Sequence, residues 1–411
     1  MGRAWHALDN IGKFYSSQAG SAVQTVFRYA ATMADAVDPG SLQAAIEGTC
    51  TAFPGFNVVL RTGFFWHYLE ESELPVEVAP ESLPVCQSLN VATDSPLIRV
   101  SYHHERLNLE VSHMVSDGRG TLVFFKELLR RYCAERYGVR DVPPAYTGTV
   151  AQQSQDGFRA AREERRGARA GGGADEEGGA TRRPVRLRAP FRIGGRRTSF
   201  DPAIYEMHLS TAAVLGRARD WDVSLTSVII ATVICALRDG MGARERRRAI
   251  RVSVPVDLRA RFGSETMKNF FALAFVDYTP GATDEPPCEV ARTVQRDLAR
   301  AIEPRRLSPR MDRMVSLERN PVLRLAPVWL KDLAMAIGDR IAASRVTVSV
   351  SNLGRIELDE RLARHVRSIS ILTSTEGLSL TLCSLGDDLS VSVSSAYARP
   401  WPVQRIREQL E

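Results

Sequence analysis

The chain has 411 residues and a mass of 45.5 kDa, with 44% hydrophobic and 25% charged residues. These values are typical of a globular protein with a large core, and they exclude a disordered chain, a collagen-like repeat and a small disulfide scaffold. The net charge of +6 is spread over the whole chain, which is too dilute for a dedicated nucleic-acid-binding protein, so we expect no nucleic acid partner.

Residues 1–151 show helix and strand patterns in alternation. A helix is predicted from about Gly120 to Tyr137, because its apolar residues recur at intervals of three or four. Leu97–His104 and Leu107–His113 are predicted to form a hairpin that turns near His104. The other predicted elements are a helix at Gly40–Phe53 and strands at Asn57–Arg61 and around Gly63–Leu69.

Residues 152–198 break this pattern, because Gly, Arg and Glu dominate and aliphatic residues are nearly absent from the first thirty positions. Such a segment buries too little apolar surface to offset its ordering entropy. We therefore expect a flexible linker with little regular structure before Arg186. Its arginine run, within Arg162–Arg188, is interpreted as a solvated segment, with contact to phosphates or to an acidic protein as the alternative.

Residues 199–411 carry a second set of elements, in which Ser224 caps a buried helix at Leu225–Arg238. The last two strands form a hairpin over residues 385–388. The complete prediction for this part consists of strands at Ala203–Leu209, Ala249–Val254, Phe270–Tyr278, Val346–Ser351, Val366–Thr373, Leu378–Ser384 and Leu389–Ser395, and helices at Thr211–Asp220, Leu225–Arg238, Glu289–Ile302 and Leu323–Ser344. The class is α/β (α+β) with mixed sheets.

The six cysteines are scattered and form no CxxC pair, which favours reduced thiols over a disulfide framework or a zinc site. His103 and His104 are consecutive strand residues that point to opposite faces, so a turn is favoured over a metal site. The N-terminus lacks the apolar region of a signal peptide, and the longest apolar stretch, Val223–Leu237, is too short to span a bilayer. We expect a cytoplasmic protein without metal or stable membrane insertion.

The most informative segment follows the second strand of the predicted hairpin. Leu107, Leu109 and Val111 alternate toward the core, and His113 falls in the same phase. A histidine in this position is either a hydrogen-bonded core residue or a catalytic base in an internal channel. Asp117 comes four residues later and could orient the loop or be neutralised by an arginine elsewhere, and Gly118 suits a tight turn.

The pattern His113-x-x-x-Asp117-Gly118 resembles the active-site motif of the chloramphenicol-acetyltransferase-like superfamily, which includes alcohol acyltransferases and peptide-synthetase condensation domains. Three further segments resemble superfamily elements in the same order. They are 254–259 (VPVDLR), whose arginine pairs with the motif aspartate, Asn269-Phe270-Phe271, and 351–354 (SNLG). Arg61–Glu70 is similar to an early strand of the bacterial alcohol-acetyltransferase-like branch. The resemblance runs from about residue 45 to residue 395.

This resemblance implies two chloramphenicol-acetyltransferase-like lobes with an active-site tunnel between them. His113 would be the general base, and Asp117 would be a structural residue that forms an ion pair with Arg259. Oxyanion donors could be the Ser351 hydroxyl, the Asn352 amide or backbone N–H groups. For Asn269, Ser351 and Asn352, a place in the site and ordinary turn chemistry remain equally open. Trp66 with Phe64 and Phe65 is interpreted as core or tunnel wall.

The expected function is that of an acyl-CoA-dependent O-acyltransferase, closest to the alcohol-acetyltransferase-like branch because Ser112, rather than a second histidine, precedes His113. Acyl-CoA would be a co-substrate, and no cofactor is expected to stay bound. The second reading is a condensation-type N-acyltransferase served by an acyl carrier protein. The third is an inactive member that binds a thioester or a partner. The resemblance to this family also implies that the protein is a monomer. The plant-type DFGWG loop is not found, and 351–354 stands nearest to it.

Overall fold

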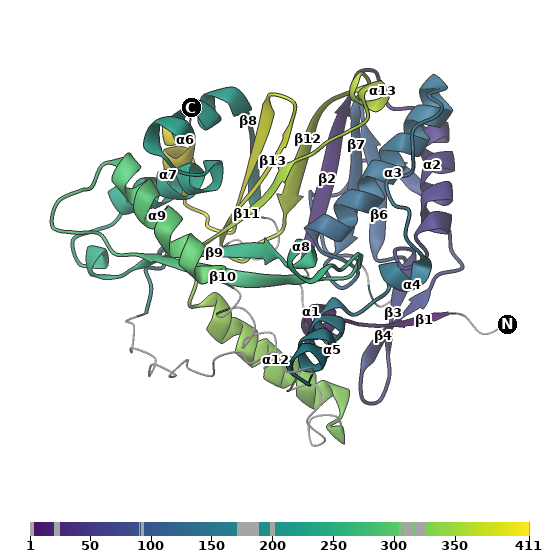
Figure 1. The fold of residues 1–411 in the computed structure, drawn as a ribbon, viewed down its shortest axis with the longest axis horizontal. Coiled ribbons are helices and arrows are strands. Elements are labelled where there is room, and N and C mark those ends of the chain that lie inside the picture. The colour runs from purple at the N-terminus through teal and green to yellow at the C-terminus, as the bar shows by residue number, and fades with distance from the viewer. Residues whose placement is uncertain are drawn as a thin grey trace.

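The computed structural model describes residues 4–19, 25–89, 91, 94–170, 189–197, 202–303, 306, 316 and 325–410. Within these residues it shows two large mixed sheets, each covered by helices, and one small sheet (Figure 1). The predicted α/β class with mixed sheets in two lobes is confirmed.

The first large sheet has the strand order β12-β2-β7-β6-β5 and is antiparallel except for the β5–β6 pair. Two helices, α2 and α3, pack on its face away from the second sheet (Figure 1), and their apolar sides share one core with it. These elements are β2 (Val26–Met33), α2 (Pro39–Ala52), β5 (Val78–Pro80), β6 (Ile98–His103), β7 (Arg106–Ser112), α3 (Gly118–Tyr137) and β12 (Val366–Thr373).

The second large sheet has the strand order β10-β9-β11-β13-β14-β8. Strand β11 runs parallel to both of its neighbours, and the other pairs are antiparallel. Helices cover the side away from the first sheet (Figure 1). These elements are β8 (Ala203–Ser210), α6 (Thr211–Trp221), α7 (Leu225–Asp239), β9 (Ile250–Asp257), β10 (Phe271–Tyr278), α9 (Pro287–Ala301), β11 (Val348–Arg355), β13 (Leu378–Leu385), β14 (Asp388–Ser395) and α14 (Trp401–Leu410).

The remaining elements lie at the lower side of the view in Figure 1 or in connections. A small antiparallel sheet has the order β1-β4-β3. The remaining elements are β1 (Trp5–Ala7), α1 (Asn10–Ser16), β3 (Val58–Thr62), β4 (His67–Glu71), α4 (Val150–Gln153), α5 (Gly157–Ala170), α8 (Arg259–Phe262), α12 (Val328–Ala343) and α13 (Glu360–Ala363), with a 3-10 turn at Glu245–Arg247. The predicted start of α12, at Leu323, lies outside the described residues.

Strand β12 corrects the predicted division of the chain at residues 152–198. It belongs by sequence to the part 199–411, yet it pairs with β2 as the edge strand of the first sheet. Its outer edge meets the second sheet, where the Cys383 thiol donates to the Ile369 carbonyl oxygen over 3.1 Å and the Thr381 hydroxyl donates to the Ile371 carbonyl oxygen. These side chains satisfy edge carbonyls that would otherwise be buried without partners. The second part of the chain therefore contributes one strand to the first sheet.

Helix α5 corrects the prediction that residues 152–198 lack regular structure before Arg186. Its first turn is anchored by Phe158 and Ala161, which are both buried. The Phe158 ring meets Phe270 edge-on, with 5.1 Å between the ring centres. Gly157 allows this approach, because a Cβ there would lie 2.7 Å from the Phe270 ring. Two apolar residues are thus enough to fix the helix against the loop before β10, while residues 171–188 of the predicted linker lie outside the described part.

Among the described residues, no single helix has the length and apolar composition to cross a membrane, and only α6 with α7, bent by 87°, passes that test as a pair. None of the six cysteines forms a disulfide.

The anchoring of α5 predicts that Phe158→Ala destabilises the protein. Removing a fully buried ring leaves a cavity against Phe270 and costs about 3–5 kcal/mol. We expect this loss in the free energy of unfolding, measured by urea denaturation. Val150→Ala is the control, because Val150 is 48% exposed on the neighbouring helix α4. Equal midpoints for the two variants would show that α5 is not part of the cooperative fold.

Candidate active site

His113 lies directly after β7, where the first sheet meets the segment that leads into β10. Its backbone N–H donates to the Thr25 carbonyl oxygen over 3.1 Å, which fixes the turn. Its ring is enclosed by aromatic rings from both lobes. The Tyr15 ring stacks on the imidazole, with 4.9 Å between the two ring centres. The centres of the Phe27 and Phe271 rings lie 4.5 Å and 6.4 Å from the imidazole centre. The imidazole is partly buried rather than sealed in the core.

Asn269 determines which ring nitrogen carries the proton. Its amide Nδ2 donates to the His113 carbonyl oxygen over 3.0 Å and to Asp9 Oδ2 over 3.1 Å. Both amide hydrogens are therefore used, and Oδ1 must face the ring, 3.5 Å from His113 Nδ1. A carbonyl oxygen only accepts, so this contact is a hydrogen bond in the tautomer that carries its hydrogen on Nδ1 and leaves the lone pair on Nε2. Asn269 thus contacts both the ring and the backbone of His113.

Asp9 is a functional candidate that the sequence analysis did not find. It caps α1 by accepting from the Gly12 N–H over 2.7 Å, and its other oxygen also accepts from the Asn269 backbone N–H over 3.0 Å. The carboxyl group is buried, and burial raises its pKa to about 6 against these hydrogen bonds. The sequence signal was an ordinary helix cap before Asn10, which does not identify a contact 260 positions away.

Burial also controls the His113 ring. Loss of solvation lowers its pKa to about 4, while the Asp117 charge and hydrogen bonds with Asn269 and the Ser116 backbone act in the opposite direction. The imidazole is therefore neutral at pH 7. A neutral ring with Nε2 unprotonated can accept a proton from a hydroxyl group.

Asp117 does not contact the imidazole as a triad member would, and it organises the turn below it. Its side chain caps α3 through the Gly120 N–H over 2.9 Å and accepts from the Phe270 N–H over 2.8 Å. Both carboxylate oxygens also bind Arg259, with Nη2 at 2.9 Å and Nη1 at 3.0 Å. The ion pair predicted between Asp117 and Arg259 is thus confirmed across 142 positions.

Arg259, at the start of α8, uses all five of its N–H groups. Two of them bind Asp117, and a third, on Nη1, donates to Asp257 Oδ1 over 2.9 Å. The remaining two donate to backbone carbonyl oxygens, from Nε to Thr266 over 2.8 Å and from Nη2 to Lys268 over 2.7 Å. The guanidinium therefore holds the loop before β10 and the turn after β7 in one network.

Two glycines permit this close packing. Gly118 is the first residue of α3, and a Cβ there would lie 2.9 Å from a methyl carbon of Leu353 in β11. Its backbone conformation is not left-handed. Glycine is therefore required at this position because Leu353 leaves no space for a side chain, and not because of a tight turn as predicted. Gly120 is more constrained, because a Cβ would lie 2.2 Å from the Met267 carbonyl oxygen. That second glycine was not singled out from the sequence.

The segment 351–354 reaches the site through Leu353 rather than through its polar side chains. Asn352 donates to the Thr226 hydroxyl over 2.8 Å and accepts from the Gly354 N–H over 2.7 Å, which holds a bulge in β11. Gly354 has a φ of 75°, as such a bulge favours. Asn352 therefore performs turn chemistry, and Ser351 lies beside it in the ladder opposite Thr381.

Other sequence candidates lie away from His113. His104 has a left-handed φ of 49° in the turn between β6 and β7, as the turn interpretation requires. No group of three or more potential metal ligands occurs among the residues that the structure describes. Phe64 and Phe65 are exposed, so they are not core. Trp66 lies beneath the Lys331 ammonium group, 3.5 Å from the ring centre.

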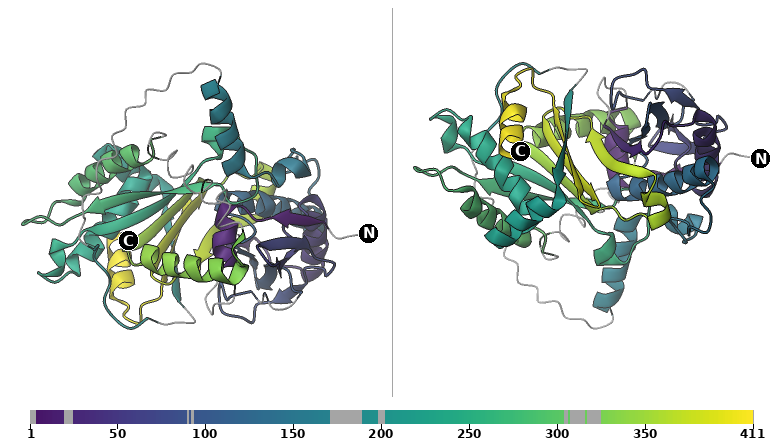
Figure 2. Two further views of the ribbon diagram at one scale, coloured as in Figure 1. Left: turned by 90° about the horizontal axis from the view of Figure 1, so that it is seen from below. Right: turned by 90° about the horizontal axis from the view of Figure 1, so that it is seen from above.

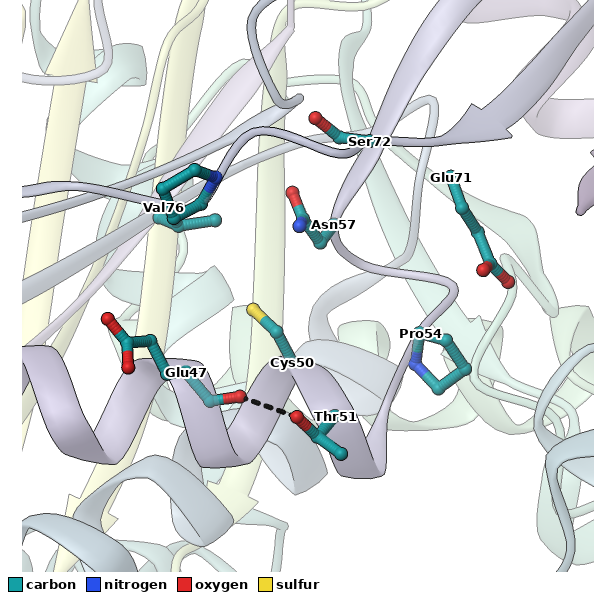
Figure 3. A pocket seen from close by; sticks show the side chains of 9 residues that line it. Glu47, Cys50, Thr51, Pro54, Asn57, Glu71, Ser72 and Val76 are labelled. Carbon is teal, nitrogen blue, oxygen red and sulfur yellow. Dashed lines mark hydrogen bonds between the residues drawn. The ribbon is translucent and has the colours of Figure 1, made fainter. Parts of the chain in front are cut away.

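A pocket of about 260 Å³ lies at the end of α2, apart from His113 (Figure 3). The Cys50 thiol there is a poor nucleophile at neutral pH, because burial raises its pKa to about 12. The pocket is lined by Glu47, Cys50, Thr51, Pro54, Asn57, Glu71, Ser72, Pro75 and Val76. It contains none of the residues of the motif.

The structure has the two-lobed fold of peptide-synthetase condensation domains, a fold that the order of the motifs predicted. The first condensation domain of the calcium-dependent antibiotic synthetase superposes with a TM-score of 0.62 at 19% identity, over 99% of this chain and 96% of that one. Polyketide synthase associated protein 5 from Mycobacterium tuberculosis gives 0.60 at 14% identity, over 100% and 97%. The starter condensation domain of rhizomide synthetase, in a mutant complex with C8-CoA and Leu-SNAC, gives 0.62 at 12%, over 99% and 93%.

Residues 208–363 match the family model of the phthiocerol/phthiodiolone dimycocerosyl transferase C-terminus. Comparison with curated protein sequences gives no match. Part of the second lobe is thus similar to an acyltransferase family, and the whole fold is similar to condensation domains.

The network around Arg259 predicts that Asp117→Asn lowers stability and activity together. Removing one charge of a buried pair leaves the other uncompensated, which costs about 3–5 kcal/mol in the free energy of unfolding. Asp257→Asn is the matched control, since Asp257 binds the same guanidinium but its side chain is 30% exposed. Urea denaturation and an acyl-transfer assay should separate the two variants. A mild Asp117→Asn would mean that the pair does not hold the site.

The burial of His113 predicts an imidazole that titrates near pH 4, measured by NMR of ¹³C-labelled histidine and assigned with His113→Gln. The folded pKa lies below the ordinary value of 6.5, so stability contributed by this group is complete above about pH 6.5 and is lost as the pH falls toward 4. His208 is an internal control, because hydrogen bonds to Glu206 and Asp388 raise its pKa to about 9. A His113 resonance that titrates at 6.5 or above would contradict the buried neutral base.

Proposed function

We propose that the protein is an acyl-CoA-dependent O-acyltransferase that transfers an acyl group from a thioester to the hydroxyl of an alcohol, hydroxylated lipid or metabolite. The observation that supports this most directly is the state of His113. Its ring is neutral, its Nδ1 faces an acceptor on Asn269, and its Nε2 is left as a base at the junction of the two lobes. An alcohol is a poor nucleophile at neutral pH and needs such a base.

The proposed reaction needs no covalent acyl-enzyme. Nε2 of His113 takes the proton of the acceptor hydroxyl while its oxygen attacks the thioester carbonyl carbon. The tetrahedral intermediate then expels the thiolate, the C–S bond breaks, and the imidazolium returns its proton to sulfur. The products are an ester and a free thiol. No bound cofactor is required, because the thioester supplies both the acyl group and the leaving group.

In this scheme Asp9 and Asn269 are positioning residues for the base. The imidazolium that forms has a hydrogen on both nitrogens, and its Nδ1–H points to the Asn269 oxygen. The Asp9 carboxylate behind that amide is 3.1 Å from Nδ2. With a pKa of about 6, it is mostly ionised at pH 7, and its negative charge favours the developing positive charge on the ring.

Asp117, Gly118 and Arg259 act in the proposal through the backbone of the turn rather than on the reacting atoms. The oxyanion donor in the proposal is the Ser351 hydroxyl, the Asn352 amide or a backbone N–H group. One of the two Asn352 amide hydrogens already donates to the Thr226 hydroxyl. The expected tunnel between the lobes would carry the donor and the acceptor to His113 from opposite ends.

The second candidate is a condensation-type N-acyltransferase served by an acyl carrier protein, because condensation domains are prominent among the structural neighbours. The residue before the base favours the first candidate. Ser112 is buried, and its hydroxyl oxygen accepts from the Met114 N–H over 3.3 Å. It supports the turn backbone and offers no second imidazole to the reacting atoms.

The proposal predicts that His113→Ala loses about 10²–10⁴-fold in kcat, because a general base contributes that much. Binding of acyl-CoA should persist, since the imidazole serves proton transfer more than ground-state affinity. Thiol release from a panel of acyl-CoA thioesters, with pooled alcohols and amines as acceptors, gives the rate, and calorimetry gives the donor affinity.

Phe64→Ala is the matched control, because that ring is 73% exposed and lies outside the network around His113. Turnover that is the same in His113→Ala and wild type would move the chemistry to another residue. Acyl transfer by wild type only from a loaded carrier protein would favour the condensation-type reading, and no transfer to any acceptor would favour an inactive binding protein.

A further inference from the structure

Helix α12 is apolar yet exposed. Its sequence from Val328 to Ala343 contains one buried residue, Lys331, whereas four large apolar side chains spaced by four residues face solvent. Their exposed fractions are 65% for Trp329, 55% for Leu333, 51% for Ile337 and 49% for Ile341. Residues spaced in this way share one side of a helix. A stripe of this size on a globular protein marks a binding surface.

The loop between β3 and β4 extends this stripe. Phe64 and Phe65 are 73% and 41% exposed, and the Phe64 carbonyl oxygen accepts from the Val328 N–H at the start of α12 over 3.0 Å. We call this joint surface the apolar platform. It consists of Phe64, Phe65, Leu325, Trp329, Leu330, Leu333, Ile337 and Ile341, which are more than half of the exposed large hydrophobic side chains that the structure describes.

The platform is fixed to the body of the protein rather than loosely attached. The Lys331 ammonium group donates to the Phe65 carbonyl oxygen over 2.8 Å and lies over the Trp66 ring. On the same side of the helix, the Asp332 carboxylate binds His67 Nε2 over 3.1 Å. Lys331 and Asp332 thus face the protein and the four apolar side chains of the stripe face outward, which is the reverse of an ordinary surface helix.

Shape, aromatic content and charge distinguish a lipid surface from a protein partner. In Figure 1 the β3–β4 loop and the start of α12 both project from the lower side of the molecule, and Figure 2 (left) shows α12 in front on that side. Projecting apolar side chains can insert into a lipid bilayer, whereas a protein partner would need pockets of complementary shape to bind them. Exposed Trp and Phe favour the headgroup region. Two exposed basic side chains, Arg340 and Arg345, lie at the end of α12, which suits anionic lipid.

We propose that the apolar platform docks the protein on the surface of an anionic lipid bilayer, with α12 parallel to the membrane plane and Trp329, Leu333 and Ile337 in the interface. Exposed Arg340 and Arg345, near the end of the helix, meet the lipid phosphates. This is peripheral binding by one face of the fold, with no spanning segment.

The docked face is close to the candidate base. After burial, the carboxylate of Asp339 in α12 is the next cause that raises the pKa of the Tyr15 phenol, so α12 lies near the ring that stacks on His113. Membrane docking itself does not depend on the proposed acyl transfer, and its test uses no activity assay.

The test is sedimentation of the full chain with vesicles of phosphatidylglycerol and phosphatidylcholine at several salt concentrations. We expect binding that weakens with salt and is weaker on pure phosphatidylcholine. The triple variant Trp329→Gln, Leu333→Gln, Ile337→Gln should bind the vesicles at least about tenfold more weakly than wild type, because it removes apolar surface from the interface. The matched control is Leu215→Gln with Leu273→Gln, two side chains of 40% and 41% exposure on α6 and β10.

Fluorescence quenching by brominated lipids identifies the docking face. Quenching should be lost in Trp329→Phe and retained in Trp221→Phe. Equal vesicle binding by wild type and the triple variant would overturn the proposal. A concentration-dependent dimer, seen by analytical ultracentrifugation without lipid and abolished in the triple variant, would assign the platform to a second copy of the chain and would equally overturn it.

Discussion

A buried carboxylate cannot remain without positive charge and hydrogen bonds, and in this protein that requirement joins the two lobes. Asp117 receives four hydrogen bonds, two of them from Arg259 and one each from the backbones of Gly120 and Phe270. The donors come from both lobes, and the carboxylate completes the start of α3 and the entry to β10 at once. The position of His113 follows from this, because the turn that carries its ring is held from below and Asn269 is held beside it.

The same arrangement explains why the motif aspartate is not the partner of the imidazole. An ionised carboxylate hydrogen-bonded directly to the ring would raise the pKa of His113, as Glu206 and Asp388 do for His208. Here Asp117 binds Arg259 instead of the ring, so its charge raises the pKa of His113 by less than burial lowers it. The negative charge of Asp9 is placed one amide further away, behind Asn269. This favours a ring that is unprotonated at rest and still accepts a proton when a hydroxyl group is presented.

The sequence predicted the local elements well and the long-range connections less well. Alternation identified β7 and the amphipathic stripe identified α3, because each buries one face against a single neighbour. Strand β2 was missed, since its side chains are buried on both faces and its run of apolar and polar residues has no clear period. The pairing of β12 with β2 could not be predicted, because nothing in the sequence of Val366–Thr373 indicates to which sheet this strand belongs. In the site, ordered motifs gave His113, Asp117 and Arg259, whereas Asp9 and Gly120 depend on contacts that only the folded chain brings together.

Helix α12 shows the limit of hydrophobic pattern as a guide to burial. Leu323–Ser344 was predicted as an ordinary helix between strands, and its apolar content is that of a core helix such as α7, which is buried along nearly its whole length. What separates the two is the partner on each side. Helix α7 packs against the second sheet with α9 and α14 around it, whereas α12 uses Lys331 and Asp332 to hold the small sheet and turns its apolar side outward. A sequence records that a helix has apolar surface to bury, and the fold decides whether the protein itself supplies the surface that covers it.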